Sequence, residues 1–304
     1  MTNINLIADY GTLCGESPLW SGEEQALYWA DIAGCKLYRY KSPEQRSELV
    51  LAGLDGFEVC GLAHHESDSF IIVNSLGVWN WRPGNPPQLI LDQIEGNPCA
   101  LNDCIADPEG RIFAGSCFFS EGNPDYRRGC LFRIDSDRTG HILDEGIRLA
   151  NGLGFSPDTQ TLYFTDSAER TIYAYDYRRT DGSIRNRREF VKIPAGEGIP
   201  DGLTVDADGY IWSAQWFGGC IVRYDPDGKE QQRIIIPAAQ TSSLAFGGPD
   251  LTDIFVTSAS LNDALSLAPP QYSPANRNIG GQLYHLNLGI RGKEEYKAKM
   301  IAAI

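Results

Sequence analysis

Short runs of apolar and aromatic residues, separated by turn residues, recur along the whole chain. They are rich in Val, Ile, Tyr, Phe and Trp and are bounded by Gly, Asp and Pro, which is typical of β-strands joined by tight turns. No long amphipathic helix is predicted, and Lys293–Lys299 is expected to form a short helical turn or a frayed end. The clearest pairs of predicted strands are 27–31 with 36–40, 69–73 with 77–81, 112–115 with 130–134, 162–165 with 171–175, 211–214 with 221–224, and 254–257 with 282–286.

These strand pairs belong to a sequence motif that occurs six times. Each copy has an apolar run, a turn of the type Asp-x-x-Gly or Pro-Asp-x-x, an aromatic strand, and a second strand that ends near Tyr-Asp. Gly152–Asp166 and Gly202–Trp216 are the clearest copies. The copies begin roughly 40–50 residues apart, the period expected of four-stranded propeller blades. The sequence therefore predicts an all-β fold, a six-bladed β-propeller around a central channel, as one domain of residues 1–304. The weaker copies begin near Ser17, Gly61, Asp103 and Ser243.

Three further segments bear on this architecture. Asn5–Ala8 is expected to form the outer strand of the last blade, which would close the ring and remove an exposed sheet edge. Phe118–Gly129 and Leu261–Gly280 interrupt the repeat, and long loops in a compact repeat are often functional. Both are therefore candidate lids over one face of the propeller.

Charge and composition exclude some classes of partner. The formal net charge is −14, and so acidic a surface repels nucleic-acid backbones. No apolar run approaches the about 18 residues that span a bilayer, and the first residues lack the basic start and apolar stretch of a secretory signal. The eight cysteines show no zinc-ligand spacing and are expected to be free core thiols, although one disulfide stays open. We expect a cytoplasmic protein that is a monomer or a weak homo-oligomer.

Four polar residues occupy the same phase of the repeat, at the start of the predicted innermost strands. They are Glu16, Asn102, Asn151 and Asp201. Since innermost strands line the channel, residues in one phase of several blades should meet at one spot. An all-oxygen set of this kind suits a hard divalent cation such as Ca²⁺, Mg²⁺ or Mn²⁺. Asn-Gly and Asp-Gly are also common turn dipeptides, and a lone Glu can be a solvated loop residue; the shared phase favours a site.

Several short sequence motifs resemble those of a known family, and they occur in the same order as in that family over nearly the whole chain. The chain resembles the gluconolactonase/regucalcin family of sugar-lactone hydrolases, also called senescence marker proteins. The motifs are Gly15-Glu-Ser-Pro-Leu-Trp20, Asn102-Asp103 with Asp107-Pro-Glu-Gly-Arg111, Asn151-Gly152 with Phe155-Ser-Pro-Asp158, Pro200-Asp-Gly202 with Val205-Asp206, Ala245-Phe-Gly-Gly-Pro-Asp-Leu251 before Val256-Thr257, and Gly280-Gly-Gln-Leu-Tyr284.

The resemblance implies a divalent metal at the channel mouth, held by Glu16, Asn151 and Asp201, with Asn102 contacting substrate or a metal-bound water. The implied reaction is hydrolysis of an aldonolactone to the aldonic acid. The chemistry is consistent, because a metal can polarise the lactone carbonyl while a neighbouring carboxylate takes a proton from water. Asp201 is the candidate for both ligand and general base. The metal itself stays open among Ca²⁺, Mg²⁺, Mn²⁺, Zn²⁺ and Fe²⁺.

The chain departs from the resemblance at one position. Many members carry Arg two residues before the Asn-Asp pair, where Ala100 stands here, so a forked donor to substrate is lost. Arg127 and Arg128 on the overhanging loop are candidates to restore positive charge, for example toward an anionic sugar, although they also suit solvated loop positions. Further pocket candidates are Glu121, Phe119 and Trp216.

Two other functions stay open at this point. One is a related propeller esterase or organophosphatase with the same central-metal layout, and the other is a non-catalytic metal- or ligand-binding propeller. A Ser-His-Asp hydrolase is not indicated, because the sequence has four histidines and no G-x-S-x-G motif. His64 and His65 lie near the head of a repeat and are interpreted as loop or core residues.

Overall fold

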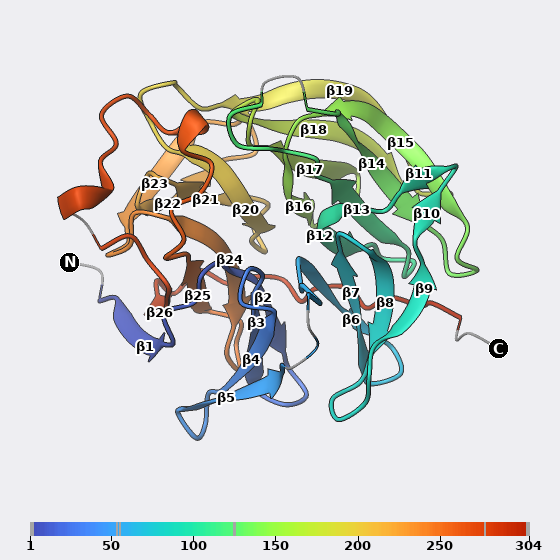
Figure 1. Cartoon of the computed structure of the whole chain (residues 1–304), viewed down its shortest axis with the longest axis horizontal. Coiled ribbons are helices and arrows are strands. Elements are labelled where there is room, and N and C mark those ends of the chain that lie inside the picture. Colours follow the sequence, from blue (N-terminus) through green and yellow to red (C-terminus); the bar gives the residue numbers. More distant parts are fainter. Residues whose placement is uncertain (1–2, 53, 55, 124–125, 277, 302–304) are drawn as a thin grey trace.

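The computed structural model describes residues 3–52, 54, 56–123, 126–276 and 278–301. Six four-stranded antiparallel sheets surround a central axis, as Figure 1 shows, and they form a six-bladed β-propeller. The predicted fold is therefore confirmed. We number the blades one to six in the order of their innermost strands along the chain.

Each of the first three blades is built from four consecutive strands, and the first strand of each is the innermost. Blade one has β2 (Gly15–Ser21), β3 (Ala26–Asp31), β4 (Lys36–Lys41) and β5 (Arg46–Leu51); blade two has β6 (Gly61–His65), β7 (Ser69–Asn74), β8 (Gly77–Trp81) and β9 (Gln88–Leu91); blade three has β12 (Leu101–Ala106), β13 (Ile112–Ser116), β14 (Gly129–Ile134) and β15 (Gly140–Ile147). A two-stranded ribbon of β10 (Gln93–Ile94) and β11 (Asn97–Pro98) precedes blade three.

Blades four and five follow the same order, and blade six borrows a strand from the other end of the chain. Blade four has β16 (Ala150–Phe155), β17 (Thr161–Asp166), β18 (Thr171–Arg178) and β19 (Ser183–Lys192); blade five has β20 (Ile199–Val205), β21 (Ile211–Trp216), β22 (Cys220–Tyr224) and β23 (Glu230–Ile235); blade six has β24 (Thr241–Gly247), β25 (Asp253–Ser258), β26 (Gln282–Asn287) and β1 (Asn5–Asp9). Two 3₁₀ turns, η1 (Leu265–Leu267) and η2 (Pro274–Asn276), lie between β25 and β26.

The N-terminal strand closes the ring as predicted. β1 pairs antiparallel with β26, and Asn5 lies opposite His285. The first and last segments of the chain therefore share one sheet, and β26 is no longer an edge.

The Asp-x-x-Gly turns that made the repeat recognisable have a common geometry. In the turn after β20, the Asp206 carboxylate accepts backbone N–H groups from Asp208 at 3.0 Å and Tyr210 at 2.9 Å. Gly209 has φ of 84°, in the left-handed region that glycine adopts without strain. Asp107 and Gly110 form the same turn in blade three. Each such turn joins an innermost strand to the next and so fixes where that strand ends.

Burial decreases from the inner strands toward the outer edge of a blade. Every residue of β3, β7 and β21 is buried, whereas most of β19, including Arg185–Glu189, is exposed. The core consists of apolar layers between adjacent sheets, with Trp29, Trp81 and Trp212 among its largest buried side chains. The charged, exposed residues of β19 protect this sheet edge from pairing with other chains.

The C-terminal segment crosses the far face of the ring. Gly292 N–H donates to the carbonyl of Leu251 in blade six at 2.7 Å, and Ala298 N–H donates to His64 in blade two at 2.7 Å. Figure 1 shows this segment running behind the blades from β26 to the opposite side. Lys293–Lys299 contains no helix, so the prediction of a helical turn or frayed end is wrong. Its extended form is fixed by hydrogen bonds to blades distant in sequence, which local residue preferences do not encode.

Two further predictions concern the cysteines and membrane-spanning segments. Free thiols, most of them buried, are found at Cys14, Cys60, Cys99, Cys104, Cys117, Cys130 and Cys220. In the part of the chain that the structure describes, no helix has the length and apolar character needed to cross a membrane.

Candidate active site

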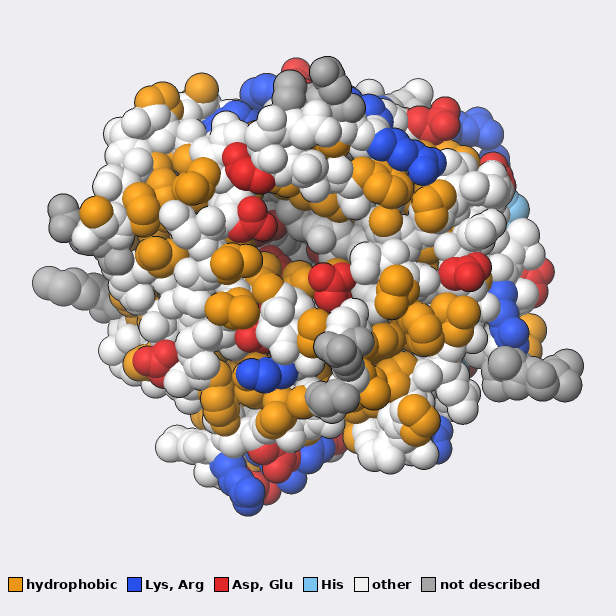
Figure 2. Space-filling view, viewed as in Figure 1, with side chains coloured by type: hydrophobic (Ala, Val, Ile, Leu, Met, Phe, Trp, Pro, Cys, Tyr) orange, Lys and Arg blue, Asp and Glu red, His pale blue; other side chains and the backbone are white. Residues whose placement is uncertain are grey.

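The innermost strands bring the four polar residues of the shared repeat phase to one end of the channel. Glu16 lies on β2, Asn102 on β12, Asn151 on β16 and Asp201 on β20. All four line one cavity of about 360 Å³. Figure 2 shows a hollow near the centre of this face with acidic side chains around it. The convergence predicted from the repeat phase is therefore observed.

The wall of this cavity combines oxygen donors, apolar side chains and two thiols. Phe119 from the blade-three loop and Trp216 from β21 lie in this wall, as the sequence suggested. Its described lining residues are Cys14, Glu16, Ile32, Glu58, Asn102, Cys117, Phe119, Leu149, Asn151, Ile199, Asp201, Trp216, Asp263 and Ala264.

A break in strand register occurs at every one of the four site residues. On β12, Leu101 pairs with Ser116 and Asp103 pairs with Gly115, which leaves Asn102 as an extra residue. The pairing of β20 also shifts between Pro200 and Leu203, around Asp201. Similar shifts follow Glu16 on β2 and Asn151 on β16, whereas β6 pairs with β7 without any shift. Bulges re-aim side chains, so here they turn the polar residues toward the channel.

Hydrogen bonds link the amides of blades three and four. Asn102 Nδ2 donates to Asn151 Oδ1 at 2.7 Å and to the Ala150 carbonyl at 2.8 Å. Asn151 Nδ2 in turn donates to Ser167 Oγ at 2.8 Å. These bonds orient the Asn151 amide, and they leave its oxygen with one further lone pair for a ligand.

Buried carboxylates in the second strands hold the turns that lead into the site. In blade four, Asp166 accepts backbone N–H groups from Arg148 at 2.8 Å and Leu149 at 3.1 Å, just before Asn151. In blade one, Asp31 accepts the N–H of Cys14 at 3.0 Å, just before Glu16. Each aspartate therefore fixes the backbone that presents a site residue.

Among the described residues no Lys, Arg or His pairs with the site carboxylates, of which Asp201 is buried and Glu16 is half-buried. Burial, followed by the charges of Glu16 and Asp103, raises the pKa of Asp201 well above its ordinary value. Burial and the charge of Asp103 likewise raise the pKa of Glu16, although Glu16 Oε2 accepts the Ser17 N–H at 2.9 Å. Burial raises the pKa of Asp103 to about 7. Buried like charges are costly unless a cation joins them.

The donor set fits a hard divalent cation. Glu16 and Asp201 offer carboxylate oxygens. Among the described residues, Glu16 accepts one hydrogen bond, from the Ser17 N–H, and Asp201 accepts none. Asn151 offers an amide oxygen. Oxygen donors of this kind match Ca²⁺, Mg²⁺ or Mn²⁺. Among the described residues no group of three or more His, Cys, Asp or Glu has the arrangement of a metal site, because this set has only two carboxylates and an amide.

The family is shown by comparison with known proteins. Residues 14–260 match the model of the SMP-30/Gluconolactonase/LRE-like region. The chain belongs to this family. It is 34% identical to the pentonolactonase XacC of Haloferax volcanii over 296 residues, which cover 97% of this chain and 98% of that protein.

Two solved structures share the fold of this SMP-30/gluconolactonase-family chain. A luciferin-regenerating enzyme superposes with a TM-score of 0.86 at 26% identity, covering 99% of this chain and 100% of that one. A calcium-binding protein, regucalcin, from Agrobacterium tumefaciens superposes with a TM-score of 0.83 at 24% identity, covering 99% of this chain and 98% of that one.

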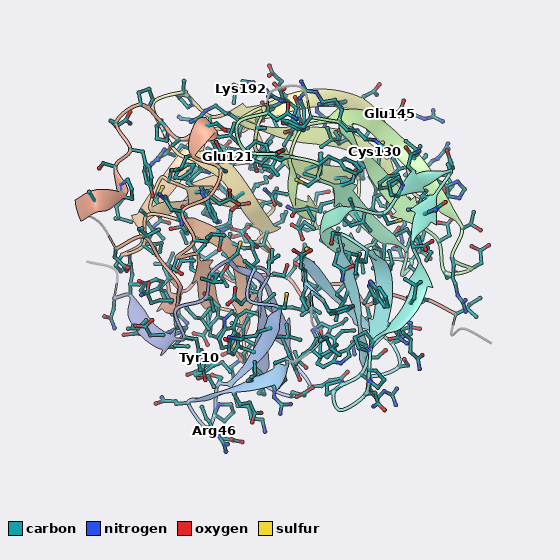
Figure 3. All side chains as sticks on the ribbon, in the orientation of Figure 1. Tyr10, Arg46, Glu121, Cys130, Glu145 and Lys192 are labelled. Carbon is teal, nitrogen blue, oxygen red and sulfur yellow. The ribbon has the colours of Figure 1, made fainter. Side chains whose placement is uncertain are left out.

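Three of the predicted substrate residues in this family member lie outside the cavity wall. Glu121 accepts the N–H of Ser266 at 3.0 Å and so joins the two overhanging loops. Arg127 donates to Asn97 Oδ1 at 2.6 Å, and Arg128 lies over the ring of Tyr126. Figure 3 shows Glu121 beside the loops of this face. Substrate contact by these three residues stays a prediction.

The two loops do overhang the site. Phe119 from Phe118–Gly129 and Asp263 from Leu261–Gly280 both line the cavity, and residues 124, 125 and 277 of these segments lie outside the described residues.

Ala100 lies outside the wall, and its carbonyl accepts the Cys117 N–H at 2.9 Å. His64 bonds to the Trp20 carbonyl and His65 to Met300, away from the cavity.

Sequence reasoning missed Glu58 and Asp263. Glu58 lies in the loop before β6, and Asp263 lies in the insertion after β25. Neither belongs to a repeated motif. Glu58 could have been found from its place in the sequence, since it stands just before blade two, which contributes none of the four polar residues at the shared phase.

Proposed function

We propose that this protein hydrolyses a sugar (aldono) lactone to the aldonic acid with the help of one divalent cation. The observation that carries the proposal is the meeting of Glu16, Asn151 and Asp201 with Asn102 in one cavity. The lactonase name of the Haloferax relative supports the reaction, and the calcium-binding regucalcin supports the cation.

Glu16, Asn151 and Asp201 would hold the cation through their side-chain oxygens. When bound, a divalent cation supplies positive charge that polarises a carbonyl oxygen and stabilises the negative charge formed on it. The buried carboxylates favour such an ion because it would relieve the repulsion between them.

Asp201 is the proposed general base. The residue is 5% exposed and lines the cavity, and its carboxylate receives no hydrogen bond from the described residues, so it is free to accept a proton. As water adds to the lactone carbonyl carbon, Asp201 takes one of its protons. The acyl bond to the ring oxygen then breaks, the ring oxygen takes a proton as a hydroxyl, and the acid ionises to release one proton.

The remaining residues position the substrate. Asn102 already donates to Asn151 and lies beside the carboxylates, which places its amide to orient a sugar hydroxyl or the attacking water. Trp216 and Phe119 form an apolar wall against which the carbon face of a sugar ring can pack. The free thiols support a reducing, cytoplasmic location, and we propose a monomer or weak homo-oligomer.

Substitution of Asp201 tests the assignment. Asp201→Asn keeps the shape of the side chain but removes the proton acceptor, and Asp201→Ala removes both functions. We expect both to lose turnover while the circular dichroism spectrum is unchanged. Asp227→Asn, in an exposed turn of blade five, removes the same charge as a control. Turnover near the wild-type rate in folded Asp201→Ala would remove Asp201 from the mechanism.

A further inference from the structure

All charged residues described in the cavity wall are negative. Among its described lining residues, Glu16, Glu58, Asp201 and Asp263 are acidic, and none is Lys, Arg or His. A divalent cation would offset two of these four formal negative charges and leave two. The cavity would therefore stay negative when the cation is bound.

Glu58 and Asp263 supply the charge that the cation site does not use. Glu58 lies in the loop before blade two and Asp263 in the insertion of blade six, and both line the same cavity as Glu16. Glu58 Oε2 accepts the Ser75 hydroxyl at 2.8 Å, and Asp263 Oδ1 accepts the Ala264 N–H at 2.7 Å. Neither forms an ion pair with a described residue, so both retain acceptor capacity toward the cavity.

Arg127 of the blade-three loop and Arg170 of the turn between β17 and β18 are engaged elsewhere. Arg127 bonds to Asn97 and lies 4.7 Å from the centre of the Phe118 ring. Arg170 donates to the Leu267 carbonyl at 3.3 Å and to the Gly198 carbonyl at 2.9 Å. These contacts hold the Arg127 guanidinium at a side-chain amide and a ring and the Arg170 guanidinium at backbone carbonyls, and neither forms a salt bridge with Glu58 or Asp263.

We propose that Glu58 and Asp263 are specificity-determining residues that admit uncharged polyhydroxy lactones and reject lactones bearing an anionic group. Carboxylates are strong acceptors for sugar hydroxyls, and they repel a second carboxylate, phosphate or sulfonate on the substrate. The same field opposes the aldonate anion and so favours release of the product. This inference rests on the proposed lactonase function and narrows its substrate class.

Neutralising the two carboxylates tests the inference. The variants are Glu58→Gln, Asp263→Asn and the double variant, and Glu145→Gln is the matched control. Glu145 is exposed on β15 at the outer edge of blade three, as Figure 3 shows, and its substitution changes the net charge as much as either single variant does. The substrates are a neutral aldono-1,4-lactone and the corresponding lactone that carries one free, ionised carboxylate besides the lactone carbonyl.

We expect the wild type to prefer the neutral lactone in kcat/KM, and the preference to shrink as salt is added. In the double variant the ratio should fall about tenfold, the size of effect expected for removing charge from a focused cleft. Inhibition by the open aldonate should tighten about tenfold in the same variant. Glu145→Gln should leave the ratio and the inhibition constant as in the wild type.

An unchanged ratio in a folded double variant would overturn the inference and leave the lactonase proposal standing. Equal use of both lactones by the wild type at low salt would also overturn it, and this measurement needs no variant. Failure of the wild type to hydrolyse any lactone with any cation would overturn both proposals.

Discussion

Asn102 Nδ2 donates a 2.7 Å hydrogen bond to Asn151 Oδ1 across the seam between blades three and four. The same nitrogen donates to the Ala150 carbonyl, so it is fixed by two acceptors of the neighbouring blade. One proposed substrate-orienting residue therefore positions one proposed cation ligand. The site depends on how adjacent blades pack, as well as on each strand.

Removal of this link should weaken cation binding. Asn102→Ala leaves the Asn151 amide oriented by its bond to Ser167 alone, and loss of a partner that orients a ligand typically costs about 10- to 100-fold in metal affinity or activity. Calcium titration by calorimetry would measure the change. Asn287→Ala, at the exposed end of β26, is the control. Unaltered calcium affinity in Asn102→Ala would show that Asn151 is held without Asn102, or is not a ligand.

Asp166 should act as a positioning residue for Asn151. Asp166→Asn replaces an oxygen acceptor for the N–H groups of Arg148 and Leu149, and a buried backbone donor left unpaired costs about 1–3 kcal/mol. We expect a lower free energy of unfolding in urea and a weaker cation affinity. Asp176→Asn, exposed on β18 of the same blade, should change neither. Lower stability with unchanged cation affinity would limit Asp166 to a structural role.

Cation binding should release protons near neutral pH. The pKa values of Glu16 and Asp201 are raised by burial, so part of the cation-free protein carries a proton on this pair at pH 7. A bound cation requires the ionised carboxylates, and its affinity should therefore rise with pH until both groups have lost their protons. Calorimetric titrations in buffers with different ionisation enthalpies measure the proton count. Identical enthalpies in all buffers would contradict the prediction.

The loop arginines should have little effect on neutral substrates. Arg127 is bonded to Asn97, and Arg128 lies over the Tyr126 ring, with neither in the cavity wall. We expect Arg127→Gln and Arg128→Gln to change kcat/KM for a neutral lactone by less than about threefold, as is usual for surface substitutions. A loss of more than tenfold in either variant would restore that arginine as a substrate ligand.

Blades one to five were predictable because each is encoded by consecutive strands of the chain. The turn around Asp206 and Gly209 and the strands beside it lie within a few residues, and the sequence repeats this unit. The shared phase of Glu16, Asn102, Asn151 and Asp201 predicted their convergence for the same reason. The strand bulges that aim these side chains leave no comparable trace in residue type.

Features that depend on distant contacts were not predictable. Lys293–Lys299 resembles a helical or frayed tail by composition, but blades two, three and six fix it in an extended form. Glu58 and Asp263 lie on non-repeating loops, and only the folded ring brings them into one cavity with Glu16. Arg127 and Arg128 looked suitable for a substrate, yet local partners hold them outside the cavity wall.

The most direct test is acid release from aldonolactones, followed with a pH indicator. The protein would be treated with chelator and then refilled with Ca²⁺, Mg²⁺, Mn²⁺, Zn²⁺ or Fe²⁺, with Asp201→Asn measured in parallel. We predict that hydrolysis above the spontaneous rate is lost with the cation, returns when a divalent cation is restored, and is absent in Asp201→Asn. Folded wild-type protein that gives only the spontaneous rate with every cation would contradict the account.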